Sequence, residues 1–263
     1  MSITAKDVQA LRQSTGVGMM DAKKALEANN GDMEAATQWL RVQGLASAAK
    51  RAGREAGEGA TAVVRNGNVA AIVEMRCETD FVAKSEEFVS LVDEIAAKVC
   101  VEGEGAASQF QERMERMLTT LKENISIGRV YRLEAGADEV VDTYIHQQAG
   151  RGVNAVAVVV KDGTEELAHE IAVHIAFAKP LFLNRDDVPA EEVAAERKTV
   201  EDISRNEGKP EAALPKIIEG RLNGWFKERV LLEQSYVKDE KQTIQQFLGG
   251  ATITAYAQVA IGS

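Results

Sequence analysis

Side chains that commonly carry out chemistry in proteins are few in this sequence and do not cluster. The 263 residues include three histidines and two cysteines, Cys77 and Cys100. His169 and His174 are five positions apart, a spacing that places them on different sides of a helix and does not suit a pair of metal ligands. The two cysteines match neither a metal-ligand spacing nor a disulfide framework. These residue types therefore predict no nucleophilic or metal-dependent reaction.

Phosphate chemistry would need a glycine-rich loop between a strand and a helix, with a lysine at a defined position. The turn TGVG at 15–18 has the glycines, but it lacks the preceding strand and the lysine. The acidic pairs Glu86-Glu87 and Asp186-Asp187 stand where solvated helix faces and caps are expected. The sequence thus gives no support to an enzyme, and we expect no cofactor and no metal.

One junction between predicted elements is harder to explain by folding alone. The segment CETDFVAK, residues 77–84, follows a strand-like apolar run and precedes a helix-like one. Thr79 or Asp80 could cap the following helix, and Phe81 could then staple the cap with an apolar contact. The alternative is a ring that faces water and contacts a partner. The spacing of the residues leaves both interpretations open.

Composition narrows the class of protein. An apolar fraction of 45% with 27% charged residues is ordinary for a globular protein. No segment approaches the roughly 18 consecutive apolar residues of a membrane span. The opening residues, MSITAKDVQALRQ, read as a capped amphipathic helix and not as a targeting peptide. Together with the isolated cysteines, these features predict a reduced, cytoplasmic setting and no membrane partner.

The net charge of −10 is unevenly distributed along the chain. Residues 1–54 carry eight Lys and Arg against five Asp and Glu, a net +3, so the remaining chain is −13. This asymmetry argues against a nucleic-acid-binding protein as a whole. The basic N-terminal part could still meet RNA or an acidic protein surface, and charge alone does not choose between them.

The N-terminal part predicts three short helices. Thr4 and Asp7 have the spacing of a capping box for the first helix, which ends before Gly16. Asp32 caps the third helix, whose apolar positions are Met33, Ala36, Trp39 and Leu40. A bundle of this size is only marginally stable alone, and we expect it to bind a partner. The segment at 46–60 then reads as a linker rich in Ala, Gly and charge, helical at first.

The rest of the chain predicts two α+β units in tandem. Asn66-Gly67 between two apolar runs is a strong hairpin signal. After this hairpin we expect helices at about 85–100 and 108–122, strands at 125–133, 140–147 and 152–161, a helix capped by Thr164, and a final alternating strand at 251–261. Strands and helices in this order predict an α+β fold rather than a parallel α/β sheet.

Two helices interrupt the second of these units. Residues 188–207 predict a charged helix, which turns at 208–210, and Pro215 fits the first turn of a second helix. The apolar stripes are Val193, Val200 and Ile203 on the first helix, and Ile217, Ile218, Leu222, Trp225 and Phe226 on the second. We therefore expect a helical hairpin that projects from the second unit.

Taken together, these segments resemble the bacterial elongation factor Ts family. TGVGMMDAKKAL (15–26) resembles the first signature of that family, and CETDFVAK resembles the second. The segments that match in order are ENISIGRV (123–130), DDVPAEEV (186–193), EGKPEAALPKIIEGRLNGWFKERVLLEQ (207–234) and the terminal strand. The resemblance covers essentially the whole chain, and two long signatures in the right order are specific.

The resemblance implies a domain organisation. It predicts a three-helix module similar to ubiquitin-associated domains with a linker helix at 1–54. A two-part α+β core with antiparallel sheets follows, with the first subdomain at 55–138 and the second at 139–263. A helical, coiled-coil hairpin at 188–228 is inserted in the second subdomain. This agrees with the elements read from periodicity.

The resemblance also implies a function. Members of this family release GDP from elongation factor Tu, the GTPase that carries aminoacyl-tRNA to the ribosome, so that GTP replaces it. The implied partner is elongation factor Tu, GDP-bound and nucleotide-free, in a 1:1 or a 2:2 assembly, with no direct nucleic-acid contact. The protein is then an exchange factor and not an enzyme. A competing class is a chaperone-like scaffold that binds partners through residues 1–54 alone, for which Asp80 and Phe81 would be dispensable.

Site residues follow from the matched positions. The resemblance assigns Asp80 and Phe81 to an outward-facing pair whose ring enters a pocket on the GTPase near the Mg²⁺-bound nucleotide. The other predicted contacts with elongation factor Tu are Thr79, Val82, Met19, Met20, Asp21, Lys23, Leu121, His146, Tyr236 and Val237. Packing in the chain's own core competes as the role of the two methionines and of Leu121.

This sequence departs from the family pattern at a few positions. Ala22 stands where a cysteine is common, and Gly128 replaces a basic residue often found there. The final strand lacks an Arg-Phe pair. These departures leave the expected exchange activity unchanged and bear on the details of the interface.

Overall fold

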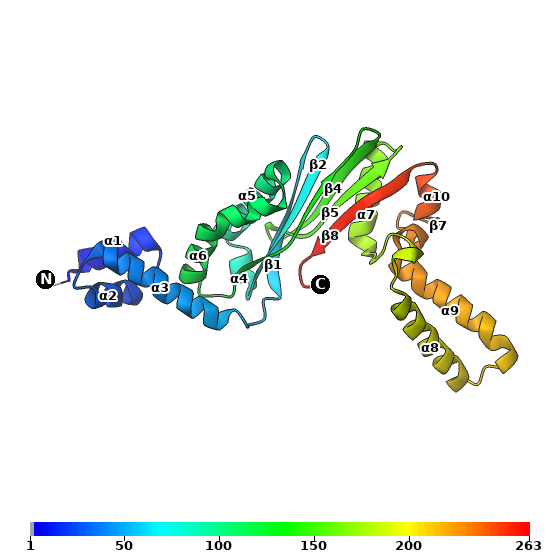
Figure 1. Ribbon diagram of the computed structural model, residues 1–263, viewed down its shortest axis with the longest axis horizontal. Coiled ribbons are helices and arrows are strands. Elements are labelled where there is room, and N and C mark those ends of the chain that lie inside the picture. Colours follow the sequence, from blue (N-terminus) through cyan, green and yellow to red (C-terminus); the bar gives the residue numbers. More distant parts are fainter. Residues whose placement is uncertain (1–2) are drawn as a thin grey trace. The chain divides into compact units, whose positions relative to one another are not determined.

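The computed structural model describes residues 3–263 and combines helices with antiparallel sheet, consistent with the predicted α+β class (Figure 1). The helices are α1 (Ala5–Thr15), α2 (Met19–Ala28), α3 (Met33–Arg51), α4 (Asp80–Ala83), α5 (Glu86–Glu102), α6 (Gln111–Thr120), α7 (Glu165–Ala178), α8 (Ala190–Asn206), α9 (Leu214–Arg229) and α10 (Ile244–Leu248). The strands are β1 (Glu58–Asn66), β2 (Val69–Cys77), β3 (Ser126–Glu134), β4 (Glu139–Gln148), β5 (Arg151–Lys161), β6 (Ser235–Tyr236), β7 (Asp239–Thr243) and β8 (Thr252–Ala260).

The chain forms two compact units. The first unit comprises the described residues up to 132 together with 145–155 and 259–263, and the second comprises 133–144 and 156–258. One three-stranded sheet has the order β1-β2-β3 and another has the order β4-β5-β8. No helix within residues 3–263 has the length and apolar character that crossing a membrane requires.

The three N-terminal helices form as their caps predict. Thr4 and Asp7 make the reciprocal capping box of α1, and Gly16 ends that helix with φ of 72°. The carboxylate of Asp32 accepts the N–H of Ala35, 2.9 Å away, at the start of α3. The bundle core consists of Val8, Leu11, Val17, Ala22, Ala25, Leu26, Ala36 and Leu40. Met33, one of the apolar positions predicted for this helix, is exposed and is not part of the core.

Helix α3 continues to residue 51 and packs against α6, so the start of the predicted linker is helical. Gly44 permits a close approach, because a Cβ there would lie 2.4 Å from the hydroxyl of Thr119. Arg51 donates to the carbonyl of Leu118 at 2.8 Å. The helix predicted at 108–122 is shorter than expected, because a 3-10 segment at 104–110 precedes α6. That segment begins next to Gly103 and contains Gly105.

The first hairpin turns one residue later than expected. Asn66 pairs with Val69 in the β1–β2 register, so the loop is Gly67-Asn68. Gly67 has φ of 60°, the positive value that a turn with Gly at its first central position requires. Strand β2 is buried on both faces, and Phe88, Leu91 and Ile95 of α5 belong to the same core.

A buried ion pair joins β2 and β3. The side chain of Glu74 is 3% exposed and accepts two hydrogen bonds from the guanidinium of Arg129, at 2.7 and 2.9 Å. Burial by itself would raise the pKa of Glu74, but the hydrogen bonds from Arg129 and Arg76 outweigh it and lower this pKa to about 2. A Cβ at Gly128 would lie 2.4 Å from the Glu74 carboxylate, so glycine leaves room for the pair.

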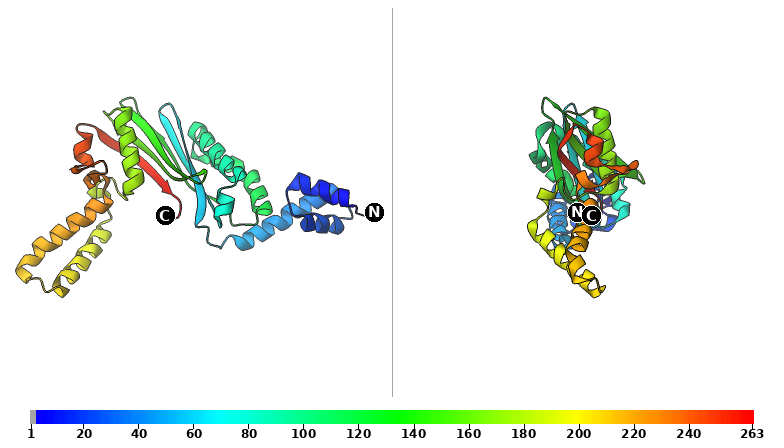
Figure 2. Two further views of the ribbon diagram at one scale, coloured as in Figure 1. Left: turned by 180° about the vertical axis from the view of Figure 1, so that it is seen from behind. Right: turned by 90° about the vertical axis from the view of Figure 1, so that its right-hand side faces the viewer.

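The two helices inserted in the second unit lie side by side as a hairpin (Figures 1 and 2). The packed residues between α8 and α9 are Val200, Leu214, Ile218 and Leu222. On α8, Val193 of the predicted stripe packs against a second cluster that includes Phe226, whereas Ile203 is exposed. At the base of the hairpin, the Leu231 N–H donates to the Phe182 carbonyl at 2.8 Å, which closes the insertion onto its own entry point.

Candidate partner-binding site

Helix α4 is a single turn with one face buried in the core and the opposite face exposed to solvent. Val82 and Ala83 are buried in the core of the first unit. Phe81, between Asp80 and Val82, is 83% exposed. Successive residues of a helix point about 100° apart, so a single anchored turn can hold an aromatic ring out into water. The ring therefore does not act as an apolar staple for the following helix, one of the two roles that the sequence left open.

The carboxylate of Asp80 is held beside Phe81 by an ion pair on the same turn. The ammonium group of Lys84 lies 2.5 Å from Asp80 Oδ2, one helical turn further on. The hydrogen bond from Lys84 lowers the pKa of Asp80, so this carboxylate is ionised at neutral pH. An exposed apolar ring therefore stands next in sequence to an ion-paired carboxylate at the surface of the first unit.

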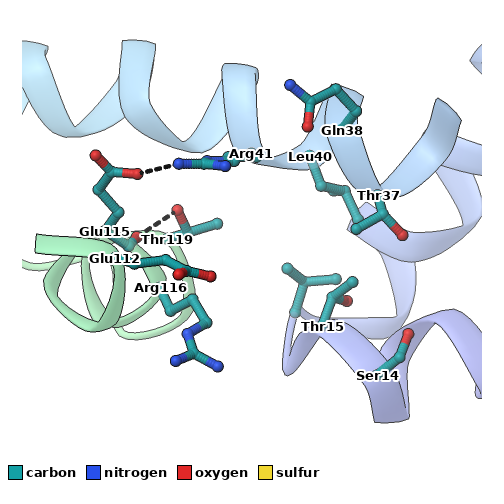
Figure 3. A pocket seen from close by; sticks show the side chains of 11 residues that line it. Ser14, Thr15, Thr37, Gln38, Leu40, Arg41, Glu112, Glu115, Arg116 and Thr119 are labelled. Carbon is teal, nitrogen blue, oxygen red and sulfur yellow. Dashed lines mark hydrogen bonds and ion pairs between the residues drawn. The ribbon is translucent and has the colours of Figure 1, made fainter. Parts of the chain in front are cut away.

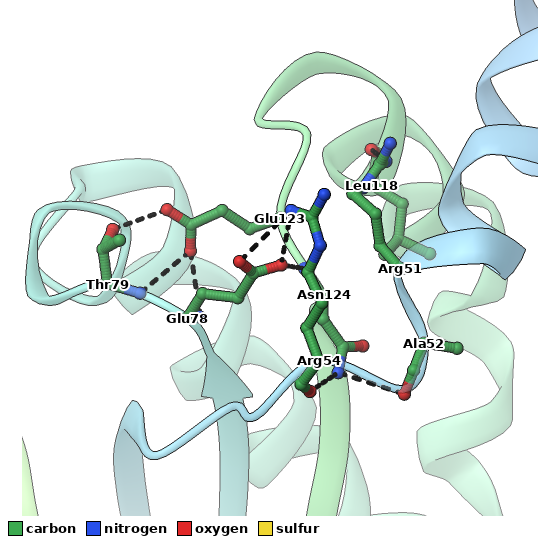
Figure 4. A network of polar contacts seen from close by, with 8 residues as sticks. All are labelled: Arg51, Ala52, Arg54, Glu78, Thr79, Leu118, Glu123 and Asn124. Atoms are coloured by element: carbon green, nitrogen blue, oxygen red, sulfur yellow. Dashed lines mark hydrogen bonds and ion pairs between the residues drawn. The ribbon is translucent and has the colours of Figure 1, made fainter.

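Thr79 forms the cap of α4 and is itself held by a distant residue (Figure 4). Its hydroxyl accepts the N–H of Val82 at 3.4 Å and donates to the carboxylate of Glu123 at 2.5 Å. The same carboxylate also accepts the N–H groups of Glu78 and Thr79. Glu123 was not among the predicted site residues, and the available signal was its place at the start of the ENISIGRV segment.

The first signature begins α2, and its predicted contacts lie at the surface. Met19 and Met20 are 51% and 73% exposed, so packing in the bundle core is not their role. Asp21 pairs with Lys122 at 2.7 Å, and Lys23 is exposed beside Glu27 at 3.7 Å. Two exposed thioether side chains next to charged groups form an adaptable apolar surface.

The other predicted contacts differ in exposure. His146 on β4 is exposed, whereas Leu121 is partly buried and packs against the core of the first unit. The ring of Tyr236 is 5% exposed and stacks on Phe247 with centroids 4.1 Å apart, and its hydroxyl donates to Glu170 at 2.5 Å. Val237 is partly buried.

All predicted contacts except Tyr236 and Val237 belong to the first unit. The structure therefore brings the two signatures and His146 into one compact body, although they are far apart in the sequence. The two remaining residues lie in the second unit, where Tyr236 packs within the core that covers α7. The burial of its ring does not favour a side-chain contact with a partner.

A pocket of about 240 Å³ opens between α1, α3 and α6 (Figure 3). Ser14 and Thr15 line it from α1, and Arg41 of α3 pairs with Glu115 of α6 at 2.8 Å on another wall. The hydroxyl groups that line it donate to backbone carbonyls, so we assign the pocket no reaction. Within residues 3–263, no group of three or more His, Cys, Asp and Glu side chains is placed to hold a metal ion.

Comparison with known proteins decides the family. A family model described as Elongation factor TS matches residues 78–263, which include Phe81, the α8–α9 hairpin and the final strand. The chain belongs to the elongation factor Ts family. The resemblance read from the two signatures is thereby confirmed at the level of the family.

Relatives named elongation factor Ts align over nearly the full length. The chain is 43% identical to the protein from Clavibacter michiganensis subsp. michiganensis over 276 residues, which cover 100% of this chain and 99% of that protein. It is 44% identical over 278 residues to the protein from Leifsonia xyli subsp. xyli, with the same coverage. A third relative, from Arthrobacter sp., is 42% identical over 284 residues and 99% of each chain. The alignments with the first two relatives therefore also cover the three-helix segment, which precedes the part matched by the family model.

Proposed function

We propose that this chain binds elongation factor Tu in its GDP-bound form and promotes the exchange of GDP for GTP. It acts as an exchange factor and makes or breaks no covalent bond, so it is not an enzyme. The observation that carries the proposal is the exposed ring of Phe81 beside the ionised Asp80, on a helical turn anchored from behind. Membership of a translation elongation factor family supports the choice of partner.

Exchange requires a difference in affinity. A factor that bound the GDP-bound and nucleotide-free GTPase equally well would shift no equilibrium, however tightly it bound. An apolar ring that fits only when the Mg²⁺ and phosphate side of the nucleotide site is displaced provides such a difference. By linkage, the bound chain lowers the affinity of the GTPase for GDP by the same ratio as bound GDP lowers its affinity for the chain. Excess nucleotide therefore releases the chain.

The remaining contacts extend this surface. We infer that the exposed Met19 and Met20 and the adjacent Lys23 contact the same GTPase, with the three-helix module acting as a ubiquitin-associated-like docking domain. His146 is accessible for a second contact. We leave the buried ring of Tyr236 out of this surface. The domain division at 54 and 138, the coiled-coil character of the hairpin and the choice between 1:1 and 2:2 assembly stay predictions.

The decisive experiment measures release of labelled GDP from elongation factor Tu in the presence of excess unlabelled nucleotide. We expect substoichiometric amounts of the parent chain to accelerate release, and Asp80→Ala and Phe81→Ala to be slower. A chaperone-like scaffold would bind the GTPase without accelerating release, and both variants would bind as the parent does. Unaccelerated release with the parent chain would refute the proposed function.

A further inference from the structure

Two junctions between elements of the first unit are joined by reciprocal hydrogen bonds, in which a glutamate carboxylate of each junction accepts backbone N–H groups of the other (Figure 4). The first junction, Glu78 and Thr79, lies between the end of β2 and the start of α4. The second, Glu123 and Asn124, lies between α6 and β3. Glu123 Oε2 accepts the N–H of Glu78 at 3.0 Å and that of Thr79 at 3.1 Å. In return, Glu78 Oε1 accepts the N–H of Asn124 at 2.6 Å.

These bonds orient the backbone directly ahead of the exposed ring. Residues 78 and 79 belong to neither β2 nor α4, so their N–H groups depend on an acceptor outside those elements. One carboxylate oxygen that accepts two successive N–H groups fixes the orientation of both peptide planes. Hydrogen bonds to an ionised acceptor are also stronger than neutral ones. Glu123 therefore sets the direction in which the chain enters α4.

The hydroxyl of Thr79 links the Glu123 carboxylate to the first turn of α4. A threonine hydroxyl has one proton, and here that proton is directed at Glu123 Oε1, 2.5 Å away. Its lone pairs are then free to accept the N–H of Val82 at 3.4 Å, which caps α4. Without Glu123 the hydroxyl could rotate away, and the turn that bears Phe81 would lose its cap.

Glu123 is placed by an unusual backbone conformation. Lys122, which precedes it, has φ of 59°, a left-handed value that is uncommon for residues with a side chain. The neighbouring Asn124 amide donates to the carbonyls of Ala52 and Arg54, at 3.3 and 2.7 Å. The exit from the three-helix module is thus tied to the same point as the turn that bears Phe81.

We propose that Glu123 is a positioning residue for nucleotide exchange: its carboxylate holds the turn that presents Phe81. The inference rests on the proposed function. The other predicted contacts, such as Met20 and His146, do not depend on this carboxylate. Loss of Glu123 should therefore lower the maximal rate of GDP release more than it weakens the association of the two proteins.

The test is a saturation curve of labelled-GDP release against the concentration of the chain. Glu123→Ala removes all three hydrogen bonds, and Glu123→Gln removes the charge while keeping the size of the side chain. Glu112→Gln is the matched control, because Glu112 is an exposed acid on α6 that is outside the network. Thr79→Val deletes the hydroxyl at constant shape, whereas Thr79→Ser retains the hydroxyl and its hydrogen bonds.

We expect Glu123→Ala to lower the maximal rate at least about tenfold, because the loss of one of its three charge-assisted hydrogen bonds already has an effect of that size. The half-saturating concentration should change by less than about threefold. Glu123→Gln and Thr79→Val should show smaller losses of the same kind. Thr79→Ser should lose less than Thr79→Val, because it keeps the hydroxyl, and Glu112→Gln should match the parent. A maximal rate for Glu123→Gln and Glu123→Ala equal to that of the parent would overturn the inference.

Amide hydrogen exchange separates positioning from general unfolding. In Glu123→Gln we expect faster exchange at residues 78–82, with the α5 core unchanged. Uniformly faster exchange throughout the first unit would overturn the positioning role, because the residue would then act on global stability. If the parent chain itself fails to release GDP, the proposed function fails and this inference with it; if only the Glu123 variants behave as the parent, the inference alone fails.

Discussion

Removing the ring of Phe81 should separate exchange activity from folding. The residue is 83% exposed, so Phe81→Ala deletes few contacts within the chain. Exposed substitutions of this kind usually change the free energy of unfolding by less than about 0.5 kcal/mol. The urea midpoint of the variant should therefore match that of the parent, and a loss of exchange cannot be ascribed to unfolding.

The loss of exchange can be sized from the exposed ring. A Phe side chain offers about 150 Å² or more for burial, and with 83% of the residue free, roughly 120 Å² remains for a partner to cover. At about 25 cal/mol per Å², full coverage is worth about 3 kcal/mol, and partial coverage about half of that. Since each 1.4 kcal/mol is about tenfold, Phe81→Ala should slow GDP release by roughly 10- to 100-fold.

A matched control is available within the chain. Phe177 in α7 is 78% exposed and lies in the second unit, outside the predicted contacts. Phe177→Ala removes the same atoms from a comparable environment, so it should leave the initial rate of labelled-GDP release unchanged. If Phe81→Ala released GDP as fast as the parent, or if both variants lost the same activity, the role assigned to the Phe81 ring would be wrong.

Four further predictions concern the stability of the fold, all measured by urea unfolding. Arg129→Met leaves the Glu74 carboxylate buried without its main partner and should cost about 3 to 5 kcal/mol; a cost below about 1 kcal/mol would contradict the ion pair's role. Because the pKa of Glu74 is about 2 in the fold against 4.5 unfolded, the parent should lose stability as the pH falls from about 4.5 towards 2, and Arg129→Met should lose less. Burial lowers the pKa of His174, whose ring lies 3.0 Å from Gln234, below its ordinary 6.5. The contribution of this residue to stability should therefore be constant above that pH and fall below it. His174→Gln should remove this slope, and an unchanged slope would refute the assignment. Gly128→Ala would place a Cβ 2.4 Å from the Glu74 carboxylate and should destabilise the chain by about 1 to 3 kcal/mol, whereas a neutral effect would show that the pair can shift.

Features that depend on neighbouring residues could be predicted from the sequence. The capping box of α1, the Asp32 cap, the Thr164 cap and Pro215 in the first turn of α9 all occur where expected. Each involves groups at most four residues apart, so local sequence is sufficient to specify it. The two long signatures likewise identified the family, because they are written in consecutive residues.

Exposure and long-range contacts could not be predicted in this way. Phe81 and Tyr236 are aromatic residues with similar flanking patterns of polar and apolar neighbours, yet one is held out into water and the other is stacked in a core. Burial depends on which elements pack around a residue, and those elements come from distant parts of the chain. The same reason explains why Gly128, a departure from the family pattern in the sequence, is accounted for only by the position of Glu74.

The sequence by itself determined the order of the longer helices and strands, the family and the candidate segment around Asp80 and Phe81, but not the short elements α4, β6, β7 and α10. The tertiary structure decided that the Phe81 ring is free and that Glu123 holds the turn beneath it. Glu123 and Thr79 are 44 residues apart, so no local periodicity connects them. Only the packing of α6 and β3 beside the end of β2 brings that carboxylate to the backbone it orients.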